Sequence, residues 1–369
     1  MRKGWEYKKI ENLCNISTGK LDANAANENG LYPFFTCSKT PLSINSYAYD
    51  CECVLVAGNG DLNVKYYNGK FNAYQRTYIL QLKNNSINVD MRFIYAFFNL
   101  YIEELRRKSI GGIIKYIKLG DLTNAKLPCP PLSNQLTIVS ELDKINELIR
   151  LKKEQLKDFD NLAQSLFYEM FGDPVENEKG WEVKKLGDIS SIGTGSTPNR
   201  KNKDFYKNGT YPWVKSTEVC NLPIYSVEEY ITEEALKNSN CTLYPPNTIL
   251  MAMYGQGKTR GQIGLLKIEA CTNQAVAAIM PTKEVVDEIF LSQHLMLMYE
   301  HIRNMARGGN QANLNLSIVK SIQIFLPPLS LQHLFAQRIE QIEREKSEVQ
   351  KSIQDLETLL ASRMQYWFE

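Results

Sequence analysis

Two stretches of the chain repeat apolar residues at alternating steps of four and three, the spacing of a coiled-coil seam. The first seam comprises Ile138, Leu142, Ile145, Ile149, Lys152, Leu156, Phe159, Ala163, Leu166 and Met170. The second comprises Phe335, Ile339, Ile342, Lys346, Val349, Ile353, Leu356, Leu360, Arg363 and Trp367. This pattern predicts helices at about 134–171 and 331–369. The first would extend about 57 Å, too long to be buried by the domain before it, so we expect the two helices to pack on each other.

A Pro-Pro-Leu-Ser sequence precedes each seam. Proline cannot continue a preceding strand, and a serine that follows it can accept hydrogen bonds from the unpaired amides of a first helical turn. We therefore expect Ser133 and Ser330 to cap the two long helices.

The segments before the seams mix two periodicities. Runs rich in β-branched and aromatic residues, at 77–82 and 263–268, predict strands, whereas 90–107 and 284–306 predict helices. Each globular segment is therefore expected to be an α/β or α+β domain.

The chain is an internal duplication. Residues 4–10 (Gly-Trp-Glu-Tyr-Lys-Lys-Ile) recur at 180–186 as Gly-Trp-Glu-Val-Lys-Lys-Leu, each copy continues to a Thr-Gly pair, and each ends in Pro-Pro-Leu-Ser. The offset between copies grows from 176 to 197, so the second copy is longer. The sequence thus predicts a tandem repeat of two globular domains, each followed by a long helix, with the helices antiparallel and related by a pseudo-two-fold axis. The predicted boundaries are 1–131, 132–172, 173–330 and 331–369.

Composition is that of a folded chain. Of 369 residues, 43% are hydrophobic and 23% charged, no apolar run is long enough to span a membrane, and no signal sequence opens the chain, so a cytoplasmic protein is expected. The cysteines form no Cys-x-x-Cys pair and the three histidines lack ligand spacing, so no metal is predicted. Net charge alternates along the chain: it is +6 for residues 1–131, −4 for 132–179, +2 for 180–330 and −2 for 331–369.

Glycine-rich turns in both copies carry basic, aromatic and amide side chains. Arginine and lysine suit phosphates and guanine edges, and asparagine and glutamine suit adenine edges, so these turns are candidates for reading DNA. The candidates are Tyr74, Gln75, Arg76, Lys115, Tyr254, Gln256, Lys258, Arg260, Asn273, Gln274, Arg307, Asn310, Gln311 and Asn313. The alternative is that they are hydrogen-bonded turns at the rim of a sheet.

The segment 252–259 resembles a phosphate-binding loop that ends in Gly257-Lys258-Thr259. Such a loop must open a helix, whereas residues 260–268 read as a turn and a strand, so we favour a strand-turn-strand. No other catalytic motif is present, and no catalytic residue is predicted. A nucleotide-binding enzyme and a coiled-coil scaffold that does not bind DNA remain the alternatives to a DNA-binding protein.

The order of motifs resembles the DNA specificity subunits of type I restriction-modification systems. The matching motifs are Lys-Leu-Gly-Asp-Ile (185–189), Thr-Gly-Ser-Thr-Pro (194–198), Met-Tyr-Gly-Gln-Gly-Lys-Thr (253–259), Thr-Asn-Gln-Ala (272–275) and Leu-Pro-Pro-Leu-Ser (326–330) before a long heptad helix. The duplication matches as well. The first copy lacks the Met-Tyr-Gly element, so the resemblance leaves open which of its loops contact DNA.

The resemblance implies a non-catalytic subunit. In that family each globular domain reads one half of a bipartite DNA target, the paired helices set the spacing between the halves, and two adenine-N6 methyltransferase subunits dock on the chain. A restriction and translocation subunit is a further expected partner. No cofactor is expected in this chain, because S-adenosylmethionine, ATP and magnesium belong to the partner subunits.

Overall fold

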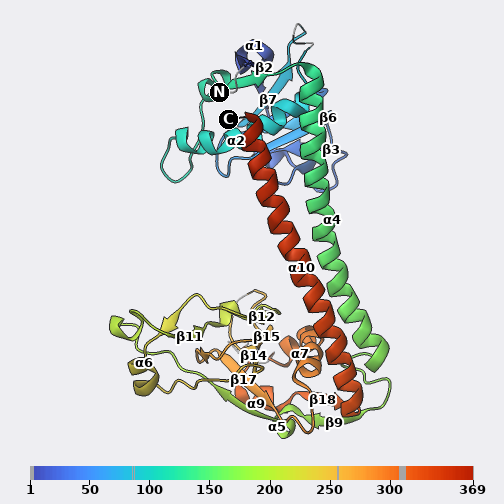
Figure 1. Ribbon diagram of the computed structural model, residues 1–369, viewed down its shortest axis with the longest axis vertical. Coiled ribbons are helices and arrows are strands. Elements are labelled where there is room, and N and C mark those ends of the chain that lie inside the picture. The colour runs from blue at the N-terminus through green and yellow to red at the C-terminus, as the bar shows by residue number, and fades with distance from the viewer. Residues whose placement is uncertain (1–3, 85, 87, 256, 307–312, 369) are drawn as a thin grey trace. The chain divides into compact units, whose positions relative to one another are not determined.

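The computed structural model describes residues 4–84, 86, 88–255, 257–306 and 313–368. It divides into two compact units: unit 1 comprises residues 1–154 and 350–369, and unit 2 comprises residues 155–349 (Figure 1). Each unit therefore contains one globular region, the first part of one long helix and the last part of the other.

Unit 1 is built on a six-stranded sheet. In spatial order its strands are β2 (Cys14–Thr18), β7 (Thr77–Leu82), β5 (Tyr49–Ala57), β6 (Val64–Ala73), β3 (Tyr32–Phe35) and β4 (Leu42–Ile44). All neighbours are antiparallel except β3 and β6. The other elements are β1 (Glu6–Lys9), which pairs with β8 (Lys126–Cys129), and the helices α1 (Ile10–Leu13), η1 (Ala23–Ala25), α2 (Met91–Lys108) and α3 (Leu119–Thr123).

Both faces of this sheet are buried. Val54 and Leu80 pair across β5 and β7 and join the apolar cluster that includes α2, whereas the adjacent pair Leu55 and Ile79 joins a second cluster. Successive side chains of a strand point to opposite faces, and the near-continuous apolar run at 53–57 is what burial of both faces requires.

Unit 2 repeats this plan. Its five-stranded sheet has the order β10 (Ser190–Thr194), β17 (Val276–Pro281), β14 (Ile249–Ala252), β15 (Ile263–Leu266) and β12 (Pro223–Ile224). Smaller sheets join β13 (Tyr230–Ile231), β11 (Tyr211–Val214) and β16 (Cys271–Thr272), and β9 (Glu182–Lys185) with β18 (Gln323–Leu326). The helices are α5 (Leu186–Ile189), η2 (Lys203–Phe205), η3 (Ser216–Glu218), α6 (Glu233–Asn238), α7 (Glu288–Leu297), α8 (Tyr299–Met305) and α9 (Leu316–Ser321).

The predicted helix at 284–306 is two helices in the structure. Met298 lies between α7 and α8 at φ −80° and ψ 7°, away from the helical value of ψ. The strand that is continuous in unit 1 as β6 is likewise divided in unit 2, into β15 and β16. β16 pairs in parallel with β11 as the end of β6 pairs with β3, which confirms the internal repeat.

The two long helices are α4 (Leu132–Phe171) and α10 (Leu329–Phe368), and their segments pair within each unit (Figure 1). In unit 1, Arg363 donates to Glu141, and Lys153 lies 2.8 Å from Glu357. In unit 2, Lys346 lies 2.8 Å from Asp160. The partner number falls as the α4 number rises, so the segments are antiparallel, as predicted.

The predicted seam residues are buried or half-buried along the paired helices. The seam residues Ile138, Leu142, Ile145, Ile149, Ile339, Ile342, Val349 and Ile353 are buried, and Leu156, Phe159, Leu356 and Leu360 are half-buried. Lys346 occupies a seam position with its side chain 16% exposed. Burial alone would lower the pKa of Lys346, but its hydrogen bonds to Asp160 and Glu343 outweigh this and raise it, so the amine stays charged within the seam.

A buried glutamine, the fourth residue of each long helix, anchors the start of that helix to the globular region before it. Gln135 donates to the carbonyls of Pro130 (2.8 Å) and Asn88 (3.0 Å) and accepts from the amide of Asp90 (3.0 Å). In the second copy, Gln332 donates to Pro327 (2.8 Å) and Val285 (3.5 Å) and accepts from Asp287 (2.9 Å). These bonds join α4 to the start of α2, and α10 to the start of α7.

The predicted serine caps are therefore wrong. The helices already begin at Leu132 and Leu329, so Ser133 and Ser330 lie inside the first turn. The proline before each leucine has a backbone φ fixed near the helical value, which lets the helix start two residues earlier than it would after a serine cap.

The end of each long helix completes the core of a unit. Phe171 of α4 is fully buried in unit 2, with its ring 4.9 Å from that of Phe290 and 5.2 Å from that of Phe335. Phe368 of α10 lies in unit 1, 5.0 Å from Phe93. Phe93 and Phe290 are equivalent, being 197 positions apart, so the same contact is made twice with the helices exchanged.

Candidate nucleic-acid interface

In unit 1, four loops meet where β2, β5 and β6 end. The amide of Gly58 donates to the carbonyl of Arg76 (2.8 Å), and the amide of Gly60 donates to the carbonyl of Lys115 (2.9 Å). The amide of Gln75 donates to the carbonyl of Leu21 (2.9 Å). These backbone bonds fix the turn at 74–76 and leave the side chains of Gln75 and Arg76 exposed.

A hollow of about 250 Å³ lies among these loops. It is lined by Thr18, Gly58, Gln75, Arg76, Tyr78, Tyr116 and Ile117. Burial raises the pKa of Tyr78, so its hydroxyl keeps its proton and donates to the carbonyl of Ile117 (3.3 Å). Of the first-copy candidates, Gln75 and Arg76 line the hollow, Tyr74 belongs to the same turn, and Lys115 adjoins Tyr116.

A second group of cations borders the loop at 58–63. Lys39, Lys65 and Arg106 line a neighbouring hollow of about 290 Å³, and Lys39 lies 3.3 Å from Asp61. Burial lowers the pKa of Lys65. These three cations are suited to DNA phosphates, although they were not among the candidates expected from the sequence.

Unit 2 brings the second-copy candidates together in the same way. The amide of Asn273 donates to Val214 (3.0 Å), as the amide of Tyr74 donates to Phe35 in unit 1 (2.9 Å). Gln274 therefore occupies the position of Gln75. Its side chain accepts from Thr197, whereas that of Gln75 donates to Asp22 at 3.5 Å.

The loop between β14 and β15 carries Tyr254, Lys258 and Arg260. Two side chains of α8 hold the backbone of this loop: the hydroxyl of Tyr299 donates to the carbonyl of Lys258 (2.5 Å), and Arg303 donates to the carbonyl of Arg260 (3.3 Å). Tyr254 and Lys258 are exposed. Within the described residues, the buried Nε of Arg260 has no hydrogen-bond partner.

Asn313 adjoins this loop, because the amide of the next residue, Leu314, donates to the carbonyl of Met253 (3.0 Å). The described second-copy candidates thus gather at one edge of the sheet. Four other candidates, Gln256, Arg307, Asn310 and Gln311, lie outside the described residues.

The repeated Thr-Gly pair has a steric cause. A Cβ atom at Gly19 would lie 2.1 Å from the carbonyl oxygen of Ala73, and one at Gly195 would lie 1.8 Å from that of Thr272. Both glycines therefore let a strand end pass directly over the backbone of the turn that carries Gln75 or Gln274. A side chain at either position would displace that turn.

The loop at 253–262 is not a phosphate-binding loop. It joins β14 to β15, which are antiparallel neighbours, and the element that follows Thr259 is the strand β15 and not a helix. Gly255 and Gly257 have positive φ angles, as a tight turn between strands requires. The strand-turn-strand prediction is confirmed, and the nucleotide-binding alternative lacks the helix N-terminus that it needs.

Two equivalent arginines were missed in the sequence. Arg106 of α2 donates to the carbonyl of Leu62 (2.9 Å), and Arg303 of α8 donates to that of Arg260. Each fixes the loop between the two central strands of its sheet. Their spacing of 197 residues, the same as that of Gln135 and Gln332, was the available signal.

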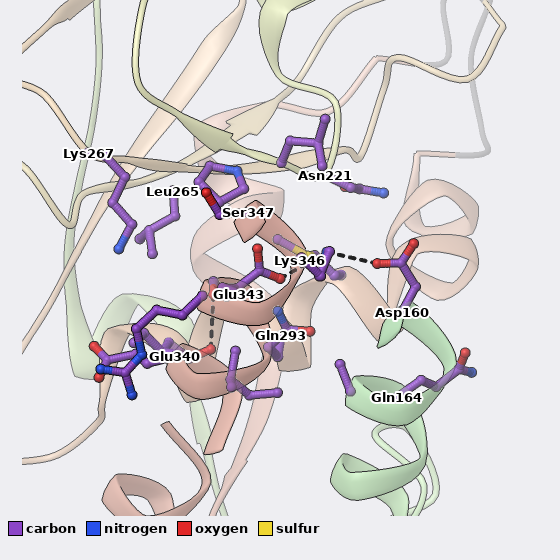
Figure 2. Close-up of a pocket in the computed structure, with 18 of the residues that line it drawn as sticks. Asp160, Gln164, Asn221, Leu265, Lys267, Gln293, Glu340, Glu343, Lys346 and Ser347 are labelled. Atoms are coloured by element: carbon purple, nitrogen blue, oxygen red, sulfur yellow. Dashed lines mark hydrogen bonds and ion pairs between the residues drawn. The ribbon is translucent and has the colours of Figure 1, made fainter. Parts of the chain in front are cut away.

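Unit 2 also has a hollow of about 670 Å³ between its helical pair, α7 and the segment 221–225 (Figure 2). Asp160, Glu343 and Lys346 lie together on one side, and Asn221, Leu265 and Lys267 lie on another. Lys346 is already paired with both carboxylates. In the described part of the chain no group of histidine, cysteine or acidic residues could hold a metal ion, and no helix has the length and apolarity of a membrane span.

Residues 2–158 and 178–358 match the family described as "Type I restriction modification DNA specificity domain". The chain belongs to this family. The match includes both globular regions and most of both long helices, and it confirms the resemblance seen in the sequence motifs.

Individual relatives agree with this assignment. The specificity subunit of the type I restriction enzyme EcoDI from Escherichia coli is 40% identical over 153 residues, which are 42% of this chain and 34% of that subunit. The MjaVIII specificity subunit from Methanocaldococcus jannaschii is 23% identical over 400 residues, 96% of this chain and 92% of that one. In two further matches the chain spans 56% and 40% of the relative's length.

A solved structure shares the fold. The S subunit of a type I restriction-modification system from M. genitalium aligns over 100% of this chain and 98% of its own, with a TM-score of 0.64 at 15% identity. The two-domain arrangement with paired long helices is thus the fold of this family.

Proposed function

We propose that this chain is the non-catalytic DNA specificity subunit of a type I restriction-modification complex. Its recognition domains, 1–131 and 173–330, would each read one half of a bipartite target, and the helices at 132–172 and 331–369 would set the spacing. The observation that carries the proposal is the equivalent placement of Gln75 and Gln274 on fixed, exposed turns of the two units. A duplicated reading edge suits a target with two halves.

Chemistry would reside in partner subunits. Two adenine-N6 methyltransferase subunits would bind S-adenosylmethionine, and restriction-translocase subunits would use ATP and magnesium, all acting on DNA in the cytoplasm. The modest charge of the second copy, +2, favours a complex in which partners supply part of the basic surface around the DNA.

The test is a genome-wide map of N6-methyladenine in a strain that carries the gene, compared with a deletion strain. We expect one bipartite methylated motif to disappear on deletion and to return with the gene on a plasmid. Co-purification of the tagged chain with an adenine methyltransferase is expected alongside. An unchanged map in a strain that expresses both proteins would contradict the proposal.

Paired substitutions in one loop should affect one half of the target. Lys258→Ala with Arg260→Ala removes two cations from the loop that α8 holds through its backbone, so we expect the loop to keep its course. The motif should become degenerate in one half, with the other half and the spacing unchanged. Sequencing of methylated sites measures this, with Lys153→Ala on α4 as a control that keeps both halves. Relaxation of both halves together would rule out separate reading.

A further inference from the structure

A short loop of unit 1 presents two isoleucines to solvent. Residues 111–115 form a projection closed by two hydrogen bonds between the backbones of Ile110 and Tyr116, of 3.0 and 2.9 Å. At its tip, Ile113 is 104% exposed and Ile114 is 62% exposed. Adjacent β-branched residues are unusual in a solvent-exposed turn, where polar residues and glycine are favoured.

The loop is shaped and anchored. Gly111 has φ +120°, and a Cβ atom there would lie 2.6 Å from the carbonyl oxygen of Ile114, so glycine is needed for the turn. At the base, Asn59 bridges to Tyr116, and the amide of Ile117 donates to Gly58 (3.0 Å). The isoleucines therefore project from a fixed base.

The base of the loop is part of the candidate interface. Tyr116 and Ile117 line the same hollow as Gln75 and Arg76, and the carbonyl of Lys115 accepts from Gly60. The exposed isoleucines thus adjoin the edge of the sheet that we propose reads DNA. Arg76 and Lys115 lie beside them and are suited to DNA phosphates.

The two copies differ in chemistry at this loop. By the offset of 197, Ile113 and Ile114 correspond in sequence to Asn310 and Gln311. Amide side chains can exchange hydrogen bonds with an adenine edge, whereas isoleucine offers only apolar contact. In the major groove the apolar group on a base edge is the methyl group of thymine.

We propose that Ile113 and Ile114 read thymine, by packing on its methyl group in the major groove of the half-site recognised by the first copy. This inference rests on the proposed function and names the chemistry of one of its contacts. Burial of a methyl group without any unpaired polar atom is favourable, and a base without that methyl loses the contact.

The test uses the full chain purified with its methyltransferase. The methylated motif supplies the target duplex, and the half that Lys258→Ala with Arg260→Ala leaves intact belongs to the first copy. Each thymine of that half is replaced in turn by uracil, which removes only the methyl group. We expect one or two positions at which uracil weakens binding about fourfold, the effect of one buried methyl group.

The variant Ile113→Ala with Ile114→Ala completes the cycle. It should bind the thymine duplex at least about tenfold more weakly and should no longer distinguish thymine from uracil. Leu31→Ala, which shortens another exposed apolar side chain of unit 1 (81% exposed), is the matched control and should behave as wild type. A thermal melt checks that the tip substitutions leave unit 1 folded.

The outcomes separate the hypotheses. A wild-type complex that methylates its motif but is insensitive to uracil at every position overturns the thymine contact and leaves the proposed function standing. Loss of the methyltransferase from the purified variant would instead make the tip a protein-docking element and would also overturn it. A wild-type complex that directs no methylation removes the proposed function itself.

Discussion

Gly195→Ala is expected to destabilise unit 2 by at least about 3 kcal/mol and to abolish reading of one half of the DNA target. The new Cβ would lie 1.8 Å from the carbonyl oxygen of Thr272 and 2.4 Å from its carbonyl carbon. Because both are backbone atoms, no side-chain rotation relieves the overlap. The hydrogen bond from the amide of Ser196 to that carbonyl (3.0 Å) would be lost, and the turn that carries Asn273 and Gln274 would move.

The change in stability is measured by urea unfolding, with hydrogen exchange in residues 155–349 as the probe of unit 2. The methylation map measures whether one half of the target is still recognised. Gly19→Ala provides the reciprocal case, because its Cβ would meet the carbonyl oxygen of Ala73 at 2.1 Å and should affect the other half. Gly120→Ala is the control, since its nearest neighbour would be the side chain of Asn124 at 3.8 Å. Wild-type stability and specificity in Gly195→Ala would refute the steric role of the Thr-Gly pair.

Periodicity and repetition carried the prediction of the fold. The run at 77–82 is β7, the helix expected at 90–107 is α2 at 91–108, and the seams correspond to α4 and α10. These features depend on patterns extending over many residues, so burial of one face leaves a strong trace in the sequence. The duplication also allowed the pairing of the two long helices to be predicted, because each copy carries an equivalent apolar seam that must be covered.

Contacts between distant residues left no such trace. Gln135 is buried because it meets three backbone groups, two of them more than 40 residues away, and nothing in its local sequence indicates this. The prediction of serine caps was wrong for a related reason, because the proline before each leucine lets the helix start two residues earlier. Residue types in the sequence indicated candidate turns, whereas the bonds by which Arg106 and Arg303 hold the loops are visible only in the structure.

Acidification from pH 7 to about pH 4 is expected to remove about 3 kcal/mol of stability from unit 2 through His294. This side chain is fully buried beside the ring of Phe325, 4.2 Å away, and its Nε2 donates to the carbonyl of Pro174 (3.0 Å). Among the described residues its Nδ1 has no hydrogen-bond partner. Burial lowers the pKa of His294 from its usual 6.5 to about 4, because the charged ring would lose its hydration.

The direction of this pH effect follows from the proton that His294 binds in the unfolded and in the folded chain. Below pH 6.5 the unfolded chain binds a proton at His294, whereas the folded chain does not bind it until about pH 4. The stability contributed by the neutral His294 is therefore complete above pH 6.5 and is lost as the pH falls from 6.5 to about 4.

His294→Phe tests this, because the corresponding first-copy residue is Phe97, which is buried. The variant gives up the bond to Pro174, about 1 kcal/mol at pH 7, yet should lose about 3 kcal/mol less than wild type on acidification. Urea unfolding of both proteins at the two pH values measures the difference, which cancels the other titrating groups. His301 is exposed, so the control variant His301→Asn should lose as much stability on acidification as wild type. If wild type and His294→Phe instead lose the same stability, protonation of the His294 ring does not destabilise the folded protein and the prediction is wrong.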